Sequence, residues 1–570
     1  MTTEAHHPFA VRDRDFLMPP TLSERKTSLK QARSHSKFVS RLRYFLPVAA
    51  LATLGLYFFS PKIHVSIGDL DASVAGVVID KGNLRMVNPK LEGVNDKQGA
   101  YVVTAKYAEQ TVSNPDFIRL TDLSSEMNDA KKGWSRLTSP KGTFETKTEK
   151  LQLFGDVRVA QSSGMTARLT RADVDMKTQL VTSPEPVKVD FPNGKLDSLT
   201  MRIDMDTKRA TFKGDVRVHL EQEKKPGTGK APAAQAQGLG RAFKSDAPVD
   251  IAAPRLTIYN EQQLAHFEGG VTTVQTGSQM TSNELKVIYS SSDSDTPQAE
   301  KTAGLGTGKL KWIDAIGEVR IATDDGRGAT ADKLSYDALK QELTLDNDVV
   351  LSQGQNVMKG KRMVSNLATG ITRFPPLGRV HGHFKPAGED AAKKAKPEAP
   401  PQPASGATTQ FDLSSTRGKP IDIESDSLTI NDKKSRAVFH GKVKVVQGTM
   451  TMRSSKLDVN YTGGDKNAAV TADGAKSGGS QISSIRAEGN VLINTAEDQA
   501  TTSDWALFSA ANQTVTIGGN VVLTQGDNII KGDQLVIDLT TNTSRFVNIG
   551  GPSTRKRVRG LFMPKQSGAQ

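Results

Sequence analysis

The chain of 570 residues contains no cysteine, which excludes disulfide bonds, thiolate zinc sites, iron–sulfur clusters and cysteine nucleophiles. Aromatic residues make up only 5% of it, so large aromatic cores are not expected. The motifs HExxH and GxSxG are absent. Among the nine histidines, His381 and His383 lie close together but lack an evident third metal ligand. The sequence therefore predicts no metal site, no cofactor and no enzyme activity.

The central part of the chain is not basic, although the formal net charge of the whole chain is +13. Residues 1–43 carry nine Lys or Arg and four Asp or Glu, and residues 551–570 carry five Lys or Arg and no acid. The long stretch between these ends is nearly neutral. No basic face for nucleic acid is therefore expected.

One uncharged apolar run of sixteen residues, 44–59, lies near the start. Aromatic residues stand at both of its ends, and Arg33, Lys37, Arg41 and Arg43 precede it. This pattern predicts an uncleaved transmembrane helix at 44–61 with residues 1–43 in the cytoplasm and the remainder across the inner membrane. A cleaved signal peptide and a buried core helix are the alternatives.

Beyond residue 62 apolar and polar residues alternate with a period of two, which predicts antiparallel strands. No amphipathic run of ten or more residues has the period of a helix. A Gly-x-Val phrase recurs at Gly155, Gly214, Gly269, Gly317, Gly441, Gly489 and Gly519. We interpret each copy as a tight turn, with a strand beginning at the valine. Repetition of one phrase indicates a repeated architecture.

The sequence also repeats over a longer distance, at an offset of 172 residues. Residues 250–289 overlay residues 422–461 without a gap, and sixteen of the forty positions are identical. Two segments rich in Pro, Ala, Lys or Gly separate the modules and predict linkers. The expected organisation is a cytoplasmic segment at 1–43, the anchor at 44–61, a β module at 62–220, a linker at 221–246, copy 1 at 247–380, a linker at 381–417, copy 2 at 418–550 and a basic tail at 551–570.

The first module, with MVNPKLEG, YVVTAKYA, LFGDVRV and TFKGDVRV, resembles the LptC family. Copies 1 and 2 resemble the OstA/LptA family, most clearly in LSQGQNVMKGKRMVSNLATGITRF and LTQGDNIIKGDQLVIDLTTNTSRF. The resemblance implies an all-β chain of three open β-jellyroll modules that exports lipopolysaccharide. Its implied partners are lipopolysaccharide, an inner-membrane ABC transporter and, through strand-edge pairing, LptA or the outer-membrane translocon. LptC-like and LptA-like units are normally separate chains, whereas here they are fused.

An acyl chain needs a continuous apolar surface, and the period of two selects the side chains that face inward. For the first module these lipid-groove candidates are Leu91, Val102, Phe144, Leu153, Val157, Val159, Val187, Val189, Phe191, Ile203, Phe212, Val216 and Val218. The positions shared by the two copies are Leu256, Ile258, Phe267, Val271, Leu285 and Val287, and Leu428, Ile430, Phe439, Val443, Leu457 and Val459. Closed core without a ligand is the alternative role for each of them.

Two other functions remain open from the sequence. One is an anchored structural or adhesion spacer, and the other is an envelope polysaccharide hydrolase that uses a carboxylate pair such as Asp324 and Asp325 or Asp346 and Asp348. A lipid path further requires neighbouring modules to share one groove. Because an open jellyroll leaves unpaired strand edges, we predict that the strand around Thr429 pairs with the trailing edge of the preceding module.

Overall fold

The computed structural model describes most of the chain after residue 64. The described residues are 65–67, 70–73, 76–80, 83–95, 99–111, 113–129, 133–221, 247–290, 309–324, 326–385, 419–462, 481–495, 499–541, 543–547 and 558–562. The predicted anchor and cytoplasmic segment lie outside them, as do most of both linkers and of the basic tail. Within the described ranges no helix is long and apolar enough to cross a membrane.

The chain divides into two units, Met1–Ser73 and Val74–Gln570. The described part of the first unit is an antiparallel pair, β1 (Val65–Ile67) and β2 (Leu70–Ser73). The second unit contains the other strands. In the described residues the only helical segment is one 3-10 turn, η4 (Asp432–Lys434). The described fold is therefore all-β, as the period of two predicts.

The first module contains β3 (Gly76–Asp80), β4 (Asn83–Val87), β5 (Lys90–Asn95), β6 (Gly99–Thr104), β7 (Tyr107–Thr111), β8 (Asn114–Asp129), β9 (Gly133–Glu145), β10 (Lys150–Gln161), β11 (Thr166–Asp175), β12 (Leu180–Ser183), β13 (Val187–Phe191), β14 (Gly194–Ser198), β15 (Thr200–Asp204) and β16 (Arg209–Leu220). Copy 1 contains β17 (Val249–Tyr259), β18 (Leu264–Gln275), β19 (Ser278–Ser290), β20 (Lys309–Thr323), β21 (Arg327–Asp337), β22 (Glu342–Gln353), β23 (Asn356–Asn366), β24 (Ile371–Phe374) and β25 (Val380–Phe384).

Copy 2 contains β26 (Ile421–Ser425), β27 (Ser427–Asn431), β28 (Arg436–Gln447), β29 (Met450–Thr462), β30 (Gln481–Asn494), β31 (Gln499–Ser509), β32 (Thr514–Gln525), β33 (Asn528–Asp538), β34 (Thr543–Val547) and, beyond residue 550, β35 (Arg559–Leu561). The bounds of β18, β19, β21, β22 and β23 coincide with those of β28, β29, β31, β32 and β33 after a shift of 172 residues. Asp426 divides the counterpart of β17 into β26 and β27.

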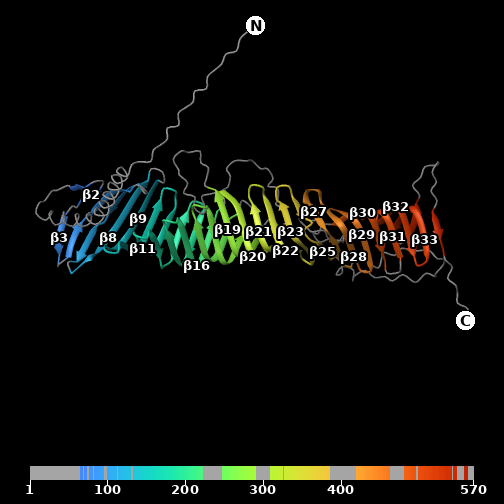
Figure 1. The fold of residues 1–570 in the computed structure, drawn as a ribbon, viewed down its shortest axis with the longest axis horizontal. Coiled ribbons are helices and arrows are strands. Elements are labelled where there is room, and N and C mark those ends of the chain that lie inside the picture. Colours follow the sequence, from blue (N-terminus) through green and yellow to red (C-terminus); the bar gives the residue numbers. More distant parts are fainter. Residues whose placement is uncertain are drawn as a thin grey trace, which may run out of the picture. The chain divides into compact units, whose positions relative to one another are not determined.

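Neighbouring strands in the sequence are mostly antiparallel neighbours in the sheet (Figure 1). The ladder also continues across both module boundaries. Strand β16 pairs with β17, β24 with β27, and β25 with β26. Thr429 lies opposite Arg373 of β24, which confirms the predicted strand-edge pairing. Because β25 extends to Phe384, the first four residues of the segment expected to be a linker, including His381 and His383, belong to a strand instead.

The Gly-x-Val phrases are not the hairpin turns that the sequence suggested. Each lies in the middle of a strand, where the register with a neighbouring strand shifts directly before the valine. The glycines have φ between 76° and 96°. Positive φ serves a β-bulge as well as a turn, so the glycine alone did not distinguish them. A bulge adds one residue to one strand and bends it. The following valine is buried in every copy.

A buried serine stands on the strand beside each bulge. Its hydroxyl donates a hydrogen bond of 2.8–3.2 Å to the backbone carbonyl two residues later. These serines are Ser139, Ser198, Ser282, Ser425, Ser454 and Ser503. The hydroxyl thereby gives a backbone acceptor a partner where the ladder is interrupted.

Candidate functional site

The apolar interior of the second unit is one continuous cluster that extends from Ala105 to Ile537. It does not stop at the module boundaries. At the first boundary Phe212 of β16 lies opposite Leu256 of β17. At the second, Phe374 of β24 lies opposite Leu428 of β27. All four side chains are buried, so a single apolar interior joins the three modules.

Most of the predicted groove residues lie in this interior. The fully buried ones are Leu153, Val157, Val187, Phe212, Val216, Val218, Leu256, Ile258, Phe267, Val271, Leu285, Leu428, Phe439, Val443, Leu457 and Val459. A second set is half-buried and packs against the first: Val159, Val189, Phe191, Ile203, Val287 and Ile430. We call this second set the half-buried row.

The half-buried row differs from the buried set in exposure, not in direction. Val159 follows the buried Val157 on the same inward face, and Ile430 follows the buried Leu428. The buried residues seal the core, whereas the half-buried side chains keep accessible apolar surface. Exposure therefore separates packing residues from residues that a ligand can contact.

Three predicted groove residues fall outside the apolar cluster. Leu91 is 44% exposed. In the β5–β6 pair Leu91 lies opposite Val103, and Val102 lies opposite Glu92. Leu91 and Val102 therefore occupy opposite faces, and Val103 is the residue that packs against the core. The sequence prediction placed Val102 on the inward face, whereas Val103 is the residue on that face. Two adjacent valines do not show which of them faces inward.

Phe144, the third of these residues, faces the correct side. It lies opposite Leu151, which packs against the core, but its own side chain is half-buried and lies at the margin of the cluster. Sequence reasoning missed other half-buried apolar residues of the interior, such as Met450 and Met452 of β29. Their alternation along the strand was the available signal.

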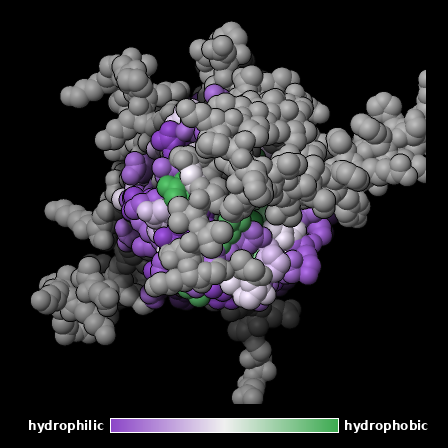
Figure 2. All heavy atoms as spheres, turned by 90° about the vertical axis from the view of Figure 1, so that its left-hand side faces the viewer, coloured by the Kyte–Doolittle hydropathy of each residue, from purple (hydrophilic) through white to green (hydrophobic). Residues whose placement is uncertain are grey.

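The outer face is polar and rich in ion pairs. Figure 2 views the molecule from the left-hand side of Figure 1, where the coloured residues are mostly hydrophilic and few are hydrophobic. On β25 the histidine pair points to carboxylates of β26: His383 Nδ1 lies 2.7 Å from Asp422 Oδ1, and His381 Nδ1 lies 3.8 Å from Glu424 Oε1. No group of three or more potential metal-ligating residues occurs in the described part of the chain.

Two acids lie at the bulge of β22. Asp346 is paired with Arg362 of the neighbouring strand. Asp348 has φ 46° and lies in the bulge itself.

Comparison with known protein families decides the identity. Residues 82–221 match the family described as lipopolysaccharide-assembly, LptC-related. Residues 250–371 and 422–543 both match the family described as LptA/(LptD N-terminal domain) LPS transport protein. The chain belongs to the LptC and LptA families of lipopolysaccharide transport proteins. These families are transport proteins rather than enzymes, and the chain combines an LptC-related segment with two LptA-like segments.

Individual relatives are similar to parts of the chain. An uncharacterised protein of Rhizobium meliloti strain 1021 is 36% identical over 140 residues, which cover 24% of this chain and 71% of the relative. The lipopolysaccharide export system protein LptH of Pseudomonas aeruginosa is 28% identical over 170 residues, which cover 29% of this chain and 90% of the relative. The crystal structure of LptH from Pseudomonas aeruginosa aligns at 19% identity with a TM-score of 0.21, covering 26% of this chain and 99% of LptH.

Proposed function

We propose that this chain is an inner-membrane-anchored component of lipopolysaccharide export. It accepts lipopolysaccharide from an ABC transporter and passes it along its apolar interior towards the outer membrane. The anchor at 44–61 and its basic flank support the orientation. The sequence contains no nucleotide-binding motif, so the energy for transport comes from the partner.

The observation that carries this proposal is the continuity of the apolar interior across both module boundaries. Burial of acyl chains is worth about 0.8 kcal/mol per methylene, so ten methylenes that left water would gain about 8 kcal/mol. An interruption of the apolar interior at a boundary would expose the acyl chains to water, and this stabilisation would be lost. The paired boundaries instead present the same apolar face from one module to the next.

The edge of the last described strands supports a proposed binding place for the next protein. Strand β24 pairs on one side with β23 and on the other with β27. Its counterpart β34 pairs with β33 alone among the described strands. The second edge of β34 therefore matches the edge that β27 occupies at the inner boundary. We assign this edge to LptA or to the outer-membrane translocon, because an unpaired edge is a template for another strand.

Photocrosslinking in cells tests the lipid path. A photoreactive amino acid at Val189 or Ile430, both in the half-buried row, should crosslink to lipopolysaccharide. The matched controls are Lys188 and Thr429, the preceding residues, whose side chains point to the opposite face of the same strands. Equal crosslinking from inward and outward positions, or none from either, would favour the spacer function instead.

A further inference from the structure

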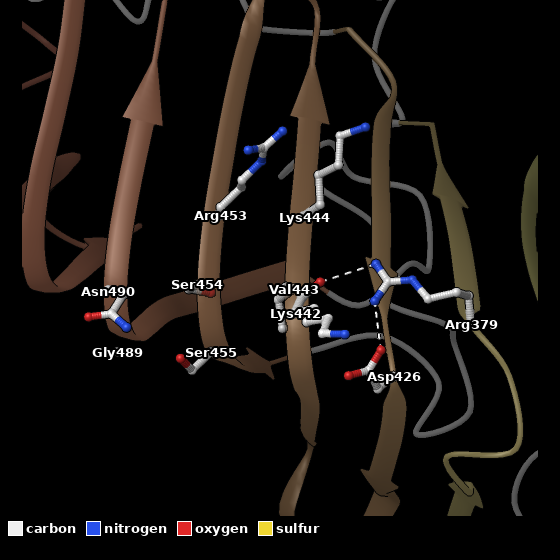
Figure 3. A pocket seen from close by; sticks show the side chains of 10 residues that line it. All are labelled: Arg379, Asp426, Lys442, Val443, Lys444, Arg453, Ser454, Ser455, Gly489 and Asn490. Atoms are coloured by element: carbon white, nitrogen blue, oxygen red, sulfur yellow. Dashed lines mark hydrogen bonds and ion pairs between the residues drawn. The ribbon is translucent and has the colours of Figure 1, made fainter.

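A hollow of about 490 Å³ lies on the outer face of copy 2, beside the boundary with copy 1 (Figure 3). Its charged lining consists of Arg379, Lys442, Lys444 and Arg453 against a single acid, Asp426. Ser454, Ser455, Gly489 and Asn490 complete the lining together with Val443. Lys444 and Arg453 alternate along their strands with the buried residues Val443 and Ser454, so they point away from the apolar interior.

Arg379 connects the two copies at this hollow. It lies between β24 and β25 of copy 1, and its Nη1 atom is 2.8 Å from Asp426 Oδ1 in copy 2. Its Nη2 atom donates to the backbone carbonyl of Lys442 at 3.1 Å and lies 3.4 Å from Glu424 Oε2. Both nearby acids are therefore already engaged by Arg379, as the dashed lines of Figure 3 show for Asp426.

The remaining three cations have no such partner. Lys444 lies directly opposite Arg453 in the β28–β29 ladder, an arrangement that brings Cβ atoms within about 5.5 Å and destabilises a sheet when the charges are alike. Glu424 lies opposite Lys444 on the other side, but Arg379 and His381 approach its carboxylate. Lys442, Lys444 and Arg453 form no ion pair with any other described residue.

Another pair of facing cations is neutralised within the chain. Arg158 lies opposite Arg168 in the β10–β11 ladder. There the Nε atom of Arg158 donates a 2.7 Å hydrogen bond to Asp156 Oδ2, which supplies the counter-charge locally. The Lys444–Arg453 pair has no such counter-charge among the described residues.

Copy 1 shows that the fold does not need these cations. At the positions 172 residues earlier, Gly270 stands for Lys442, Thr272 for Lys444 and Thr281 for Arg453. The strands that carry them have the same bounds in both copies. These three cations are therefore specific to copy 2, although the backbone of the strands is shared.

We propose that this hollow binds a phosphorylated saccharide. A phosphate ester suits three uncompensated cations, including an arginine that can donate two parallel hydrogen bonds. The volume exceeds that of a single phosphate group and falls in the range of small-ligand sites. The Ser455 hydroxyl and the Asn490 amide supply both donors and acceptors for sugar hydroxyls. This site is separate from the proposed acyl path, which uses the opposite face of the strands.

Calorimetry on the full chain in detergent tests the proposal with glucose 6-phosphate, glucose and inorganic phosphate as probes. We expect glucose 6-phosphate to bind more tightly than either other probe, with an affinity that falls as salt rises. The variant Lys444→Thr/Arg453→Thr carries the residues of copy 1 and should bind at least tenfold more weakly. Arg158→Thr/Arg168→Thr removes the same charge elsewhere and should bind within twofold of the native chain.

Several results would overturn the proposal. Equal binding to the native chain and to Lys444→Thr/Arg453→Thr would exclude the hollow as the site, provided that circular dichroism shows both to be folded. Tighter binding of inorganic phosphate than of the sugar phosphate would exclude the saccharide.

A photoreactive residue at Ser455 identifies the source of the ligand. A crosslink to lipopolysaccharide assigns the phosphate ester to its saccharide. Binding of glucose 6-phosphate without that crosslink assigns it to a free sugar phosphate, and both results support the site. A crosslink to a protein, without sugar-phosphate binding, would replace the proposal with an acidic protein partner.

Discussion

At the scale of single residues, the buried serines beside the bulges have a measurable role. Ser503 donates a 3.2 Å hydrogen bond to the Trp505 carbonyl. We expect Ser503→Ala to lower the free energy of unfolding by about 1 kcal/mol, the usual worth of one buried hydrogen bond. Chemical denaturation measures the change. Thr502→Ala, at the exposed neighbouring position, is the control and should change it by less than about 0.5 kcal/mol.

The equivalent position in copy 1 shows that the fold tolerates the loss of this hydroxyl. Copy 1 has Ala331 at the position of Ser503, so the carbonyl there does without the hydroxyl. A loss as large as that of a core cavity, about 3 kcal/mol or more, would contradict a role limited to one hydrogen bond.

Asp432, in the turn after β27, couples stability to pH. Burial raises the pKa of its carboxyl from 3.8 to about 6, although Arg327 lowers it in part. A raised acid pKa favours the folded state most below pH 4, and this contribution is lost as pH rises through 6. We therefore expect Asp432→Asn to be more stable than the native chain at pH 8, by about 1 to 3 kcal/mol, and equal to it at pH 3.5.

Denaturation of both proteins at the two pH values tests this expectation. A difference that is the same at pH 8 and pH 3.5 would mean that the carboxyl does not titrate as its burial requires. Asn431, whose side chain accepts the Lys434 amide, caps the turn and is left unchanged in the variant.

At the scale of one element, the mid-strand bulge depends on its glycine. Gly441 has φ 80°, and a Cβ built there would lie 2.5 Å from Asp426 Oδ2 and 2.8 Å from Asp426 Cβ. We expect Gly441→Ala to lower the free energy of unfolding by about 1 to 3 kcal/mol through strain and this close contact. Thermal unfolding followed by circular dichroism measures it.

Lys442 provides the matched control for the bulge. It has φ 44°, and copy 1 carries Gly270 at that position. Lys442→Gly removes the strain of a side chain in the left-handed region, so we expect no loss of stability and a gain of up to about 1 kcal/mol. A large loss in this variant would show that the second bulge residue depends on its side chain rather than on its backbone.

At the scale of the whole molecule, the two copies should be interchangeable as neighbours of the first module. Phe212 and Val218 of β16 lie opposite Leu256 and Ile251. Leu428 and Ile423 occupy the equivalent places in copy 2. We expect a chain that lacks residues 249–420 to fold, with β26 and β27 pairing with β16 as β17 does.

Circular dichroism and gel filtration test the shortened chain. Its strand content per residue should match that of the full chain, and crosslinking from Ile430 to lipopolysaccharide should persist. Aggregation, or loss of strand signal, would show that copy 1 supplies a boundary contact that copy 2 cannot reproduce.

The sequence by itself determined the strand class, the 172-residue register and most of the inward side chains. Alternation records which face of a strand is buried, and it depends only on local geometry. It therefore identified Phe439 and Val157 as interior residues, and the shared motifs identified the families. Val102 and Val103 show the limit of this pattern, because two adjacent apolar residues do not indicate which of them faces inward.

Only the tertiary structure decided what the recurring glycines do and which inward residues remain accessible. A positive φ suits both a turn and a bulge, and the choice at Gly441 depends on whether the neighbouring strand continues alongside it. Ile430 is half-buried whereas Ile258, at the same position of copy 1, is buried, and the cationic hollow depends on Arg379 reaching copy 2 across the boundary. These are relations between strands, so no single segment of the sequence contains them.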